Sequence, residues 1–230
     1  MATNPTVVLV HGAWHGAWVW TAFEKVLAER GVPAVAVDLT SQGTDAAKLG
    51  DLRSDVDLLR ETITGVNGPV VILAHSAYGG VVTSEAADGP DNVKRIVLLT
   101  SFAADVGESL SGLFGNHGTP PFLDAADGLL TVKPGFGSRL FYSDCPADVA
   151  ADSEARLLPQ HAVTFGQEAR AAAWRKIPTS YIVTTEDQAM HPDGQRRMVE
   201  RVNDSVDLHS GHSPFLSQPE KLADLLAERL

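Results

Sequence analysis

Pro69-Val70-Val71-Ile72-Leu73-Ala74-His75-Ser76-Ala77-Tyr78-Gly79-Gly80 runs from an apolar, β-branched segment directly into a serine and a pair of glycines. In a sharp turn between a strand and a helix, a serine hydroxyl projects from the end of the sheet, and the next backbone N–H points toward a substrate oxygen. The stretch therefore predicts a nucleophile elbow at Ser76. Ala74 and Tyr78 replace the outer glycines of the usual G-x-S-x-G pattern.

The elbow admits two registers and one competing interpretation. Counted from the strand, the nucleophile is Ser76. Counted back from Gly79-Gly80, its position falls on Ala77, and the chain would lack a nucleophile. The competing interpretation is a turn serine that only caps the following helix. The strand length and the adjacent His75 favour Ser76 as the nucleophile.

Three further segments carry residues of the types that such a serine needs. They are the apolar run Val7-Val8-Leu9-Val10-His11-Gly12-Ala13, the strand-like run Tyr181-Ile182-Val183-Thr184-Thr185-Glu186-Asp187 and the loop Ser210-Gly211-His212-Ser213-Pro214. A serine hydroxyl requires a base within hydrogen-bond reach and a third group that orients the base. The predicted nucleophile and base are Ser76 and His212, and the acid comes from the carboxylates at the end of the strand-like run, Glu186 or Asp187. Their chain order of serine, acid and histidine is that of α/β-hydrolases.

Other residues compete for the roles of base and acid. His209 and His191 are alternative bases, but the Gly-His-Ser-Pro loop favours His212. Glu186 and Asp193 are alternative acids.

The backbone N–H groups of Ala13 and Ala77 are predicted to form the oxyanion hole, which stabilises the negative charge of a tetrahedral intermediate. Their side chains matter little for this role. The other histidines near these turns, His11, His15 and His75, are expected to hold loops through hydrogen bonds.

Together, these motifs resemble the small α/β-hydrolases that include plant methylesterases and hydroxynitrile lyases, with their bacterial esterase relatives. The resemblance covers nearly the whole chain. Its motifs are His11-Gly12-Ala13-Trp14-His15-Gly16-Ala17-Trp18, the elbow, Thr185-Glu186-Asp187-Gln188 with Pro192 and Gln195, and Gly211-His212-Ser213-Pro214. The resemblance selects Asp187 as the acid and implies serine esterase chemistry without a cofactor.

Short β-branched runs alternate with amphipathic helical runs, which predicts an α/β fold with a mostly parallel central sheet and helices on both faces. One helical stripe contains Trp20, Phe23 and Leu27 and ends at Gly31. The predicted core strands are Thr6–Val10, Ala34–Asp38, Val70–Ala74, Val93–Leu99, Ser180–Thr184 and Ser205–Leu208.

Residues 102–174 interrupt this alternation with glycines, prolines and short helix-like pieces. The resemblance implies that they form a cap over the serine, inserted into an α/β-hydrolase core of residues 1–101 and 175–230. The alternative for the aromatic residues of this insertion is that most of them form its own small core. The residues expected to contact the substrate are Gly12, Trp14, Tyr78, Phe102, Phe114 and Phe122.

Composition and charge argue against several classes of binding partner. The chain has 230 residues, enough for one domain, and a formal net charge of −11 with no basic stripe, which argues against nucleic acid and anionic membranes. No metal-ligand spacing appears among the histidines and the single cysteine, Cys145, so we expect no bound metal. The N-terminus has no signal-peptide pattern, and a cytoplasmic protein is predicted. The oligomeric state stays open.

The leading hypothesis is a serine hydrolase that cleaves a small, neutral and hydrophobic carboxylic ester or lactone through an acyl-enzyme. A hydroxynitrile lyase is an alternative. The lyases of the resembling family carry a threonine and a lysine where this chain has Gly12 and Ser213, which disfavours the lyase. A catalytically silent binding protein on the same fold is a further alternative, because a fold does not fix a function.

Overall fold

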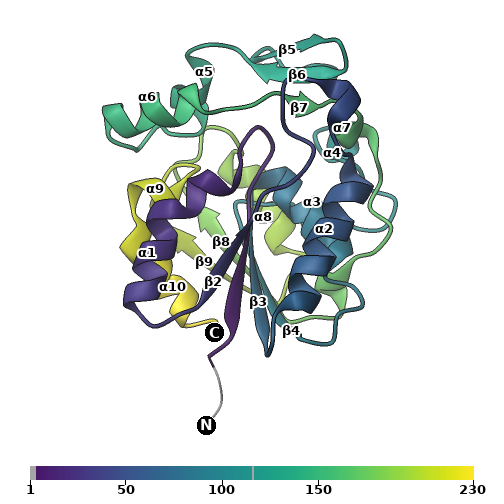
Figure 1. Cartoon of the computed structure of the whole chain (residues 1–230). Helices are drawn as coiled ribbons and strands as arrows, with labels where there is room; N and C mark the ends of the chain where they lie inside the picture. Colours follow the sequence, from purple (N-terminus) through teal and green to yellow (C-terminus); the bar gives the residue numbers. More distant parts are fainter. Residues whose placement is uncertain (1–3, 116) are drawn as a thin grey trace.

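The core of the molecule is a parallel sheet of six strands in the order β2-β1-β3-β4-β8-β9 (Figure 1). The computed structural model describes residues 4–115 and 117–230. The strands are β1 (Thr6–Val10), β2 (Ala34–Val37), β3 (Val70–His75), β4 (Val93–Leu99), β8 (Thr179–Thr184) and β9 (Asp204–Leu208). The predicted α/β fold is confirmed, and each predicted strand matches its observed bounds to within one residue at one end.

Successive side chains of a strand point to opposite faces of the sheet, and both faces are covered. On β1, Val7 and Leu9 pack with α1 and α10, whereas Val8 and Val10 pack on the opposite side with α2 and α3. The helices of the first face are α1 (Thr21–Glu29), α9 (Pro214–Ser217) and α10 (Pro219–Ala227), and those of the second are α2 (Leu52–Gly65), α3 (Ser76–Ala86) and α8 (Pro192–Val199). Two single-turn 3₁₀ helices, η1 (Ala17–Trp20) and η2 (Ala46–Lys48), lie in the loops that follow β1 and β2.

The predicted helical stripe corresponds to the end of η1 and to α1. Trp20, Phe23 and Leu27 are all buried in the core. The helix ends at Glu29, and Gly31 follows with a φ of +70°, a conformation that glycine adopts without a steric penalty.

Between β4 and β8 the chain leaves the sheet and forms a small layer beyond the carboxyl ends of the central strands (Figure 1). We call residues 102–174 the inserted segment. Its strands β5, β6 and β7 form a separate antiparallel sheet. Its elements are α4 (Leu110–Leu113), β5 (Leu123–Ala126), β6 (Leu129–Val132), α5 (Phe136–Leu140), α6 (Ala147–Ala155), β7 (Gln160–His161) and α7 (Val163–Gly166), and η3 (Ala173–Arg175) leads back toward β8.

Within the described residues, no helix is both long and apolar enough to cross a bilayer.

Candidate active site

The predicted elbow has the backbone geometry of a strained turn. β3 ends at His75, and Ser76 follows with a φ of +63° before α3 continues. This left-handed conformation costs a non-glycine residue roughly 1–2 kcal/mol, so the surrounding packing must hold it. Ala77 lies in the first turn of α3. Ser76, and not Ala77, therefore occupies the turn between the strand and the helix.

The glycine pair that follows allows α3 to pack closely against the ends of two strands. A Cβ atom on Gly79 would lie 2.9 Å from the carbonyl oxygen of His11, and one on Gly80 would lie 2.1 Å from that of Phe102. Both positions thus exclude a side chain. The close approach that an elbow requires is kept, one residue further along the helix than the usual pattern has it.

The structure brings together the three side chains predicted from the sequence. Ser76 Oγ lies 3.1 Å from His212 Nε2, and His212 Nδ1 lies 2.7 Å from Asp187 Oδ2. Ser76 follows β3, Asp187 follows β8 and His212 follows β9. They meet because parallel strands end at the same edge of the sheet.

Asp187 lies in a site that favours its ionised form. Burial alone would raise the pKa of this carboxyl group, but the charge of His212 and several hydrogen bonds outweigh burial, so the pKa lies below the usual 3.8. Oδ1 accepts hydrogen bonds from the backbone N–H groups of Ala189 and Met190 at 2.8 Å each, and Oδ2 accepts one from the Thr100 hydroxyl at 2.6 Å. An ionised carboxylate beside Nδ1 holds the imidazole so that Nε2 is free to accept a proton.

The competing bases and acids lie elsewhere. The side chain of His209 is 82% exposed, and its Nε2 lies 3.3 Å from Glu186 Oε1. The side chain of His191 is 77% exposed, and its Nδ1 accepts a hydrogen bond from the backbone N–H of Asp193 at the start of α8. None of these four side chains contacts Ser76 through a hydrogen bond in the described part of the chain.

An acid from the inserted segment fixes the loop that carries His212. Asp144 Oδ2 accepts hydrogen bonds from the Ser210 hydroxyl and the Gly211 backbone N–H at 2.8 Å each, and from the Ser217 hydroxyl at 2.9 Å. A Cβ atom on Gly211 would lie 2.5 Å from Asp144 Oδ1, so the contact requires a glycine. The sequence offers no signal for Asp144, because nothing in its local pattern distinguishes it from a surface acid.

The three other histidines near the elbow are buried and hydrogen-bonded. Nε2 of His11 accepts a bond from the backbone N–H of Leu39 at 3.1 Å, and Nε2 of His75 lies 3.0 Å from the backbone oxygen of His212. Loss of hydration on burial lowers the pKa of His11, and lowers that of His75 well below 6.5. Both contacts fit the predicted role of holding loops.

His15 links the loop after β1 to the inserted segment. Its Nδ1 lies 2.7 Å from the backbone oxygen of Ala13, and its Nε2 lies 2.8 Å from the Tyr142 hydroxyl. Burial lowers the pKa of His15 to about 3. The imidazole is therefore neutral at physiological pH, and it ties a predicted oxyanion-hole residue to the layer above it.

The predicted oxyanion-hole residues flank Ser76. Gly12, which precedes Ala13, packs directly on the elbow, because a Cβ atom at position 12 would lie 2.6 Å from Ser76 Cβ. Ala77 is in the first turn of α3, where the N–H groups have no partner within the helix. Ala13 and Ala77 thus lie on the two segments that meet at the serine.

Of the residues expected to contact the substrate, most gather where the inserted segment meets the core. The ring of Trp14 stacks on Phe141 at 5.8 Å between centroids and meets the edge of Phe122 at 6.0 Å. The rings of Phe102 and Phe114 lie 5.0 Å apart. Phe141 also lies against His212, with 5.5 Å between ring centroids.

Tyr78 differs from this expectation. The sequence places it among the predicted substrate contacts, but the residue is only 1% exposed and its hydroxyl donates a 2.5 Å hydrogen bond to Asp55 Oδ2 in the interior. The phase of α3 directs the side chain toward α2. Its hydroxyl therefore belongs to a buried polar cluster and not to the Ser76 site.

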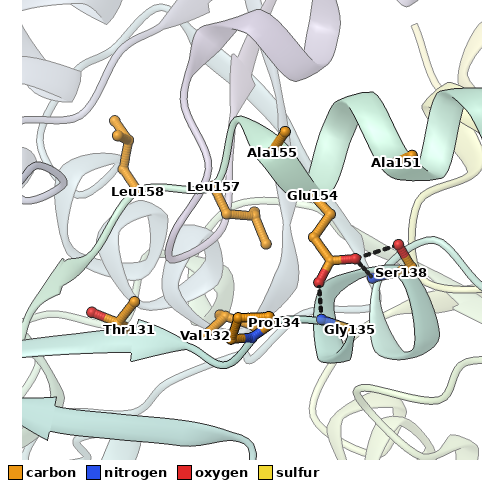
Figure 2. A pocket seen from close by; sticks show the side chains of 10 residues that line it. All are labelled: Thr131, Val132, Pro134, Gly135, Ser138, Ala151, Glu154, Ala155, Leu157 and Leu158. Atoms are coloured by element: carbon orange, nitrogen blue, oxygen red, sulfur yellow. Dashed lines mark hydrogen bonds between the residues drawn. The ribbon is translucent and has the colours of Figure 1, made fainter.

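A separate cavity of about 430 Å³ lies within the inserted segment (Figure 2). Its lining includes Leu157, Leu158 and Glu154, but not Ser76 or His212. The Glu154 carboxylate points to the backbone of Gly135 and Ser138 and accepts hydrogen bonds from both (Figure 2). Its oxygens are thus already hydrogen-bonded within the protein.

No cluster of three or more His, Cys, Asp or Glu side chains suited to a metal ion occurs in residues 4–115 and 117–230.

A model of the family described as "Alpha/beta hydrolase family" matches residues 7–225, and the chain belongs to that family. It is 27% identical to "Probable hydrolase R7" of Phoma sp., with 98% of each chain covered. It is 28% identical to "Alpha-hydroxynitrile lyase" of Arabidopsis thaliana, covering 96% of this chain and 95% of that one. Among solved structures, "a methylesterase protein MES16 from Arabidopsis" superposes with a TM-score of 0.82 at 27% identity, with 98% of both chains covered. These relatives include a probable hydrolase, a lyase and a methylesterase.

Proposed function

We propose that the protein is a serine esterase that cleaves a small carboxylic ester through an acyl-enzyme. The observation that carries this proposal is the line of contacts from Ser76 Oγ to His212 Nε2 and from His212 Nδ1 to Asp187, at 3.1 and 2.7 Å, with the serine in a left-handed turn. An isolated helix-capping serine needs neither the base nor the strained backbone.

In the acylation step, Ser76 Oγ attacks the carbonyl carbon of the ester while His212 Nε2 takes the hydroxyl proton. The carbonyl oxygen becomes an oxyanion, which accepts hydrogen bonds from the backbone N–H groups of Ala13 and Ala77. Asp187 stabilises the imidazolium that forms. As the intermediate collapses, His212 gives its proton to the leaving alkoxide, and an alcohol departs.

In the deacylation step, water takes the place of the alcohol. His212 removes a proton from the water as its oxygen attacks the acyl carbon, and then returns that proton to Ser76 Oγ as the ester bond to the serine breaks. The products are a carboxylic acid and the regenerated enzyme. The sequence of steps consumes one water and needs no cofactor.

For the substrate, we infer a neutral and hydrophobic small-molecule ester or lactone. Phe141 lies against His212, Trp14 stacks on Phe141, and Phe122 meets the edge of Trp14. We propose that these rings, with Phe102, line the site, since apolar linings bind apolar acyl or alkyl groups. We propose that the inserted segment acts as the cap that contributes this lining. The similarity to a methylesterase supports an ester as the substrate.

Cleavage of a hydroxynitrile is the second candidate, because the chain is 28% identical to a plant hydroxynitrile lyase. The residue that follows His212 is Ser213, which is fully buried and carries no charge to assist a departing cyanide. This observation favours the esterase over the lyase.

The test combines turnover with covalent labelling. Purified protein is assayed on p-nitrophenyl acetate and butyrate and on an aromatic cyanohydrin, and is treated with a fluorophosphonate probe whose attachment site is mapped by mass spectrometry. We expect ester hydrolysis, no cyanide release, and labelling at Ser76 that Ser76→Ala abolishes. Folded protein that neither hydrolyses an ester nor accepts the probe would support the silent binding protein instead.

A further inference from the structure

Asp55 is the centre of a buried polar cluster outside the Ser76 site. The carboxylate, on α2, is fully buried, and so are Ser41, in the loop after β2, and Gln160, on β7. Its Oδ2 accepts hydrogen bonds from the hydroxyls of Ser41 and Tyr78 at 2.5 Å each, and its Oδ1 accepts bonds from the backbone N–H and the hydroxyl of Thr40 at 2.6 and 2.7 Å.

A buried cluster of polar groups fixes the relative position of the segments it joins, and it adds little to the free energy of folding. Moving a carboxylate out of water costs several kcal/mol, and apolar side chains of similar volume often replace such groups without loss of stability. When every member is hydrogen-bonded, however, a buried network holds its segments in one relative position. Asp55 holds α2, α3 and the loop after β2 in this way.

The chain of hydrogen bonds continues from Ser41 to the loop after β1. Gln160 Nε2 donates to Ser41 Oγ at 2.9 Å, and Gln160 Oε1 accepts a hydrogen bond from the backbone N–H of Trp14 at 3.3 Å. One continuous path therefore runs from Trp14 through Gln160, Ser41 and Asp55 to Tyr78.

Each end of this path adjoins a proposed oxyanion donor. Trp14 follows Ala13, and Tyr78 follows Ala77. We propose that Tyr78, Asp55, Ser41 and Gln160 are positioning residues that set the distance between the N–H groups of Ala13 and Ala77. This inference rests on the proposed function, since it assigns the network to the same site.

The inference accounts for the bulky residue in the elbow. Because the close helix packing is provided by Gly79 and Gly80, position 78 is free to carry a long side chain. The hydroxyl of Tyr78 then reaches Asp55 and anchors the first turn of α3, which contains Ala77.

The experiment compares Tyr78→Phe and Gln160→Met, alone and together, with Thr83→Val as the matched control. Thr83 is buried on α3, and its hydroxyl has no hydrogen-bond partner among the described residues. Displacing a group of the site by a fraction of an ångström to 1 Å can cost up to about a hundredfold in rate. We expect each network variant to lower kcat about tenfold with KM nearly unchanged, and the pair to lower it by less than the product.

Two further readouts separate a positioning role from general damage. The pH profile of kcat/KM is expected to stay unchanged, because His212 and Asp187 are untouched. Hydrogen exchange of the Trp14 amide is expected to accelerate severalfold in Tyr78→Phe, at the other end of the path, and not in Thr83→Val.

An unchanged kcat in Tyr78→Phe, an equal loss in Thr83→Val, or a fully multiplicative double variant would each overturn the inference. Wild-type protein without ester turnover would contradict the proposed function alone. In that case the exchange rate of the Trp14 amide still tests whether the loop after β1 is coupled to the first turn of α3. The same rate in Tyr78→Phe as in the wild type would show that they are not coupled.

Discussion

Gly12 and Ser76 lie in direct contact, so that a Cβ atom on Gly12 would be 2.6 Å from Ser76 Cβ and 3.1 Å from Ser76 Oγ. Real Cβ atoms essentially never show a contact as short as the first of these distances. The loop after β1 and the elbow are therefore in contact only because position 12 has no side chain, and the spacing between Ala13 and Ala77 depends on it.

Gly12→Ala is expected to lower kcat/KM about a hundredfold or more, because the new methyl group pushes the loop carrying Ala13 away from Ser76. Hydrolysis of p-nitrophenyl butyrate measures the effect. Gly65→Ala, at the end of α2, is the matched control, since a Cβ atom there meets no atom within 4 Å. Equal activity in the two variants would contradict the steric reason.

Ser76→Gly is expected to be more stable than Ser76→Ala, and both variants are expected to be inactive. The φ of +63° strains alanine but not glycine, and the gain is about 1 kcal/mol after the greater flexibility of unfolded glycine is subtracted. For a domain of this size, that difference corresponds to a melting temperature about 2–4 °C higher. Thermal unfolding by circular dichroism measures it, and an alanine variant that melts at the same or a higher temperature would show that the turn is unstrained.

His15→Gln is expected to make the free energy of unfolding less dependent on pH between pH 7 and pH 4. His15 has a pKa of about 3 in the folded protein, below its usual 6.5, because burial removes its hydration. Below pH 6.5 the unfolded chain therefore binds a proton at His15 that the folded protein does not bind. The contribution of His15 to the free energy of unfolding is complete above pH 6.5 and is lost as the pH falls toward about 3. One such proton corresponds to at most about 1.4 kcal/mol per pH unit.

Urea unfolding between pH 7 and pH 4 measures this slope. His15→Gln should lose less free energy of unfolding than the wild type over the interval. His209→Gln is the control, because the His209 side chain remains in contact with water in the folded protein. Parallel curves for His15→Gln and the wild type would show that His15 does not cause the decline.

The core of the fold could be predicted because its determinants are local. Strands that are covered on both faces read as apolar runs, and Val70–His75 is such a run, buried at every position. The proximity of the three predicted catalytic side chains could be predicted from the sequence because each follows a strand of a parallel sheet. Their catalytic roles remain predictions.

The supports of the site could not be predicted because they join segments far apart in the chain. Asp144 contacts Gly211 across 67 positions, and Gln160 contacts the backbone of Trp14 across 146. The sequence on either side of Asp144 or Gln160 does not indicate that the residue supports the site. The direction of Tyr78 depends on the rotation of α3 about its axis, which the two possible elbow registers left undetermined.

The inserted segment is bonded to two loops of the core at three points: Tyr142 to His15 and Gln160 to Trp14 in the loop after β1, and Asp144 to Gly211 in the loop after β9. A chimaera whose insertion lacked counterparts of Tyr142, Asp144 and Gln160 would lose these three attachments along with the aromatic rings that we propose as the lining. Selectivity and turnover would then change together in such a swap. We therefore expect substitutions of single aromatic side chains near Ser76 to alter substrate preference with less loss of turnover, because they leave the three attachments in place.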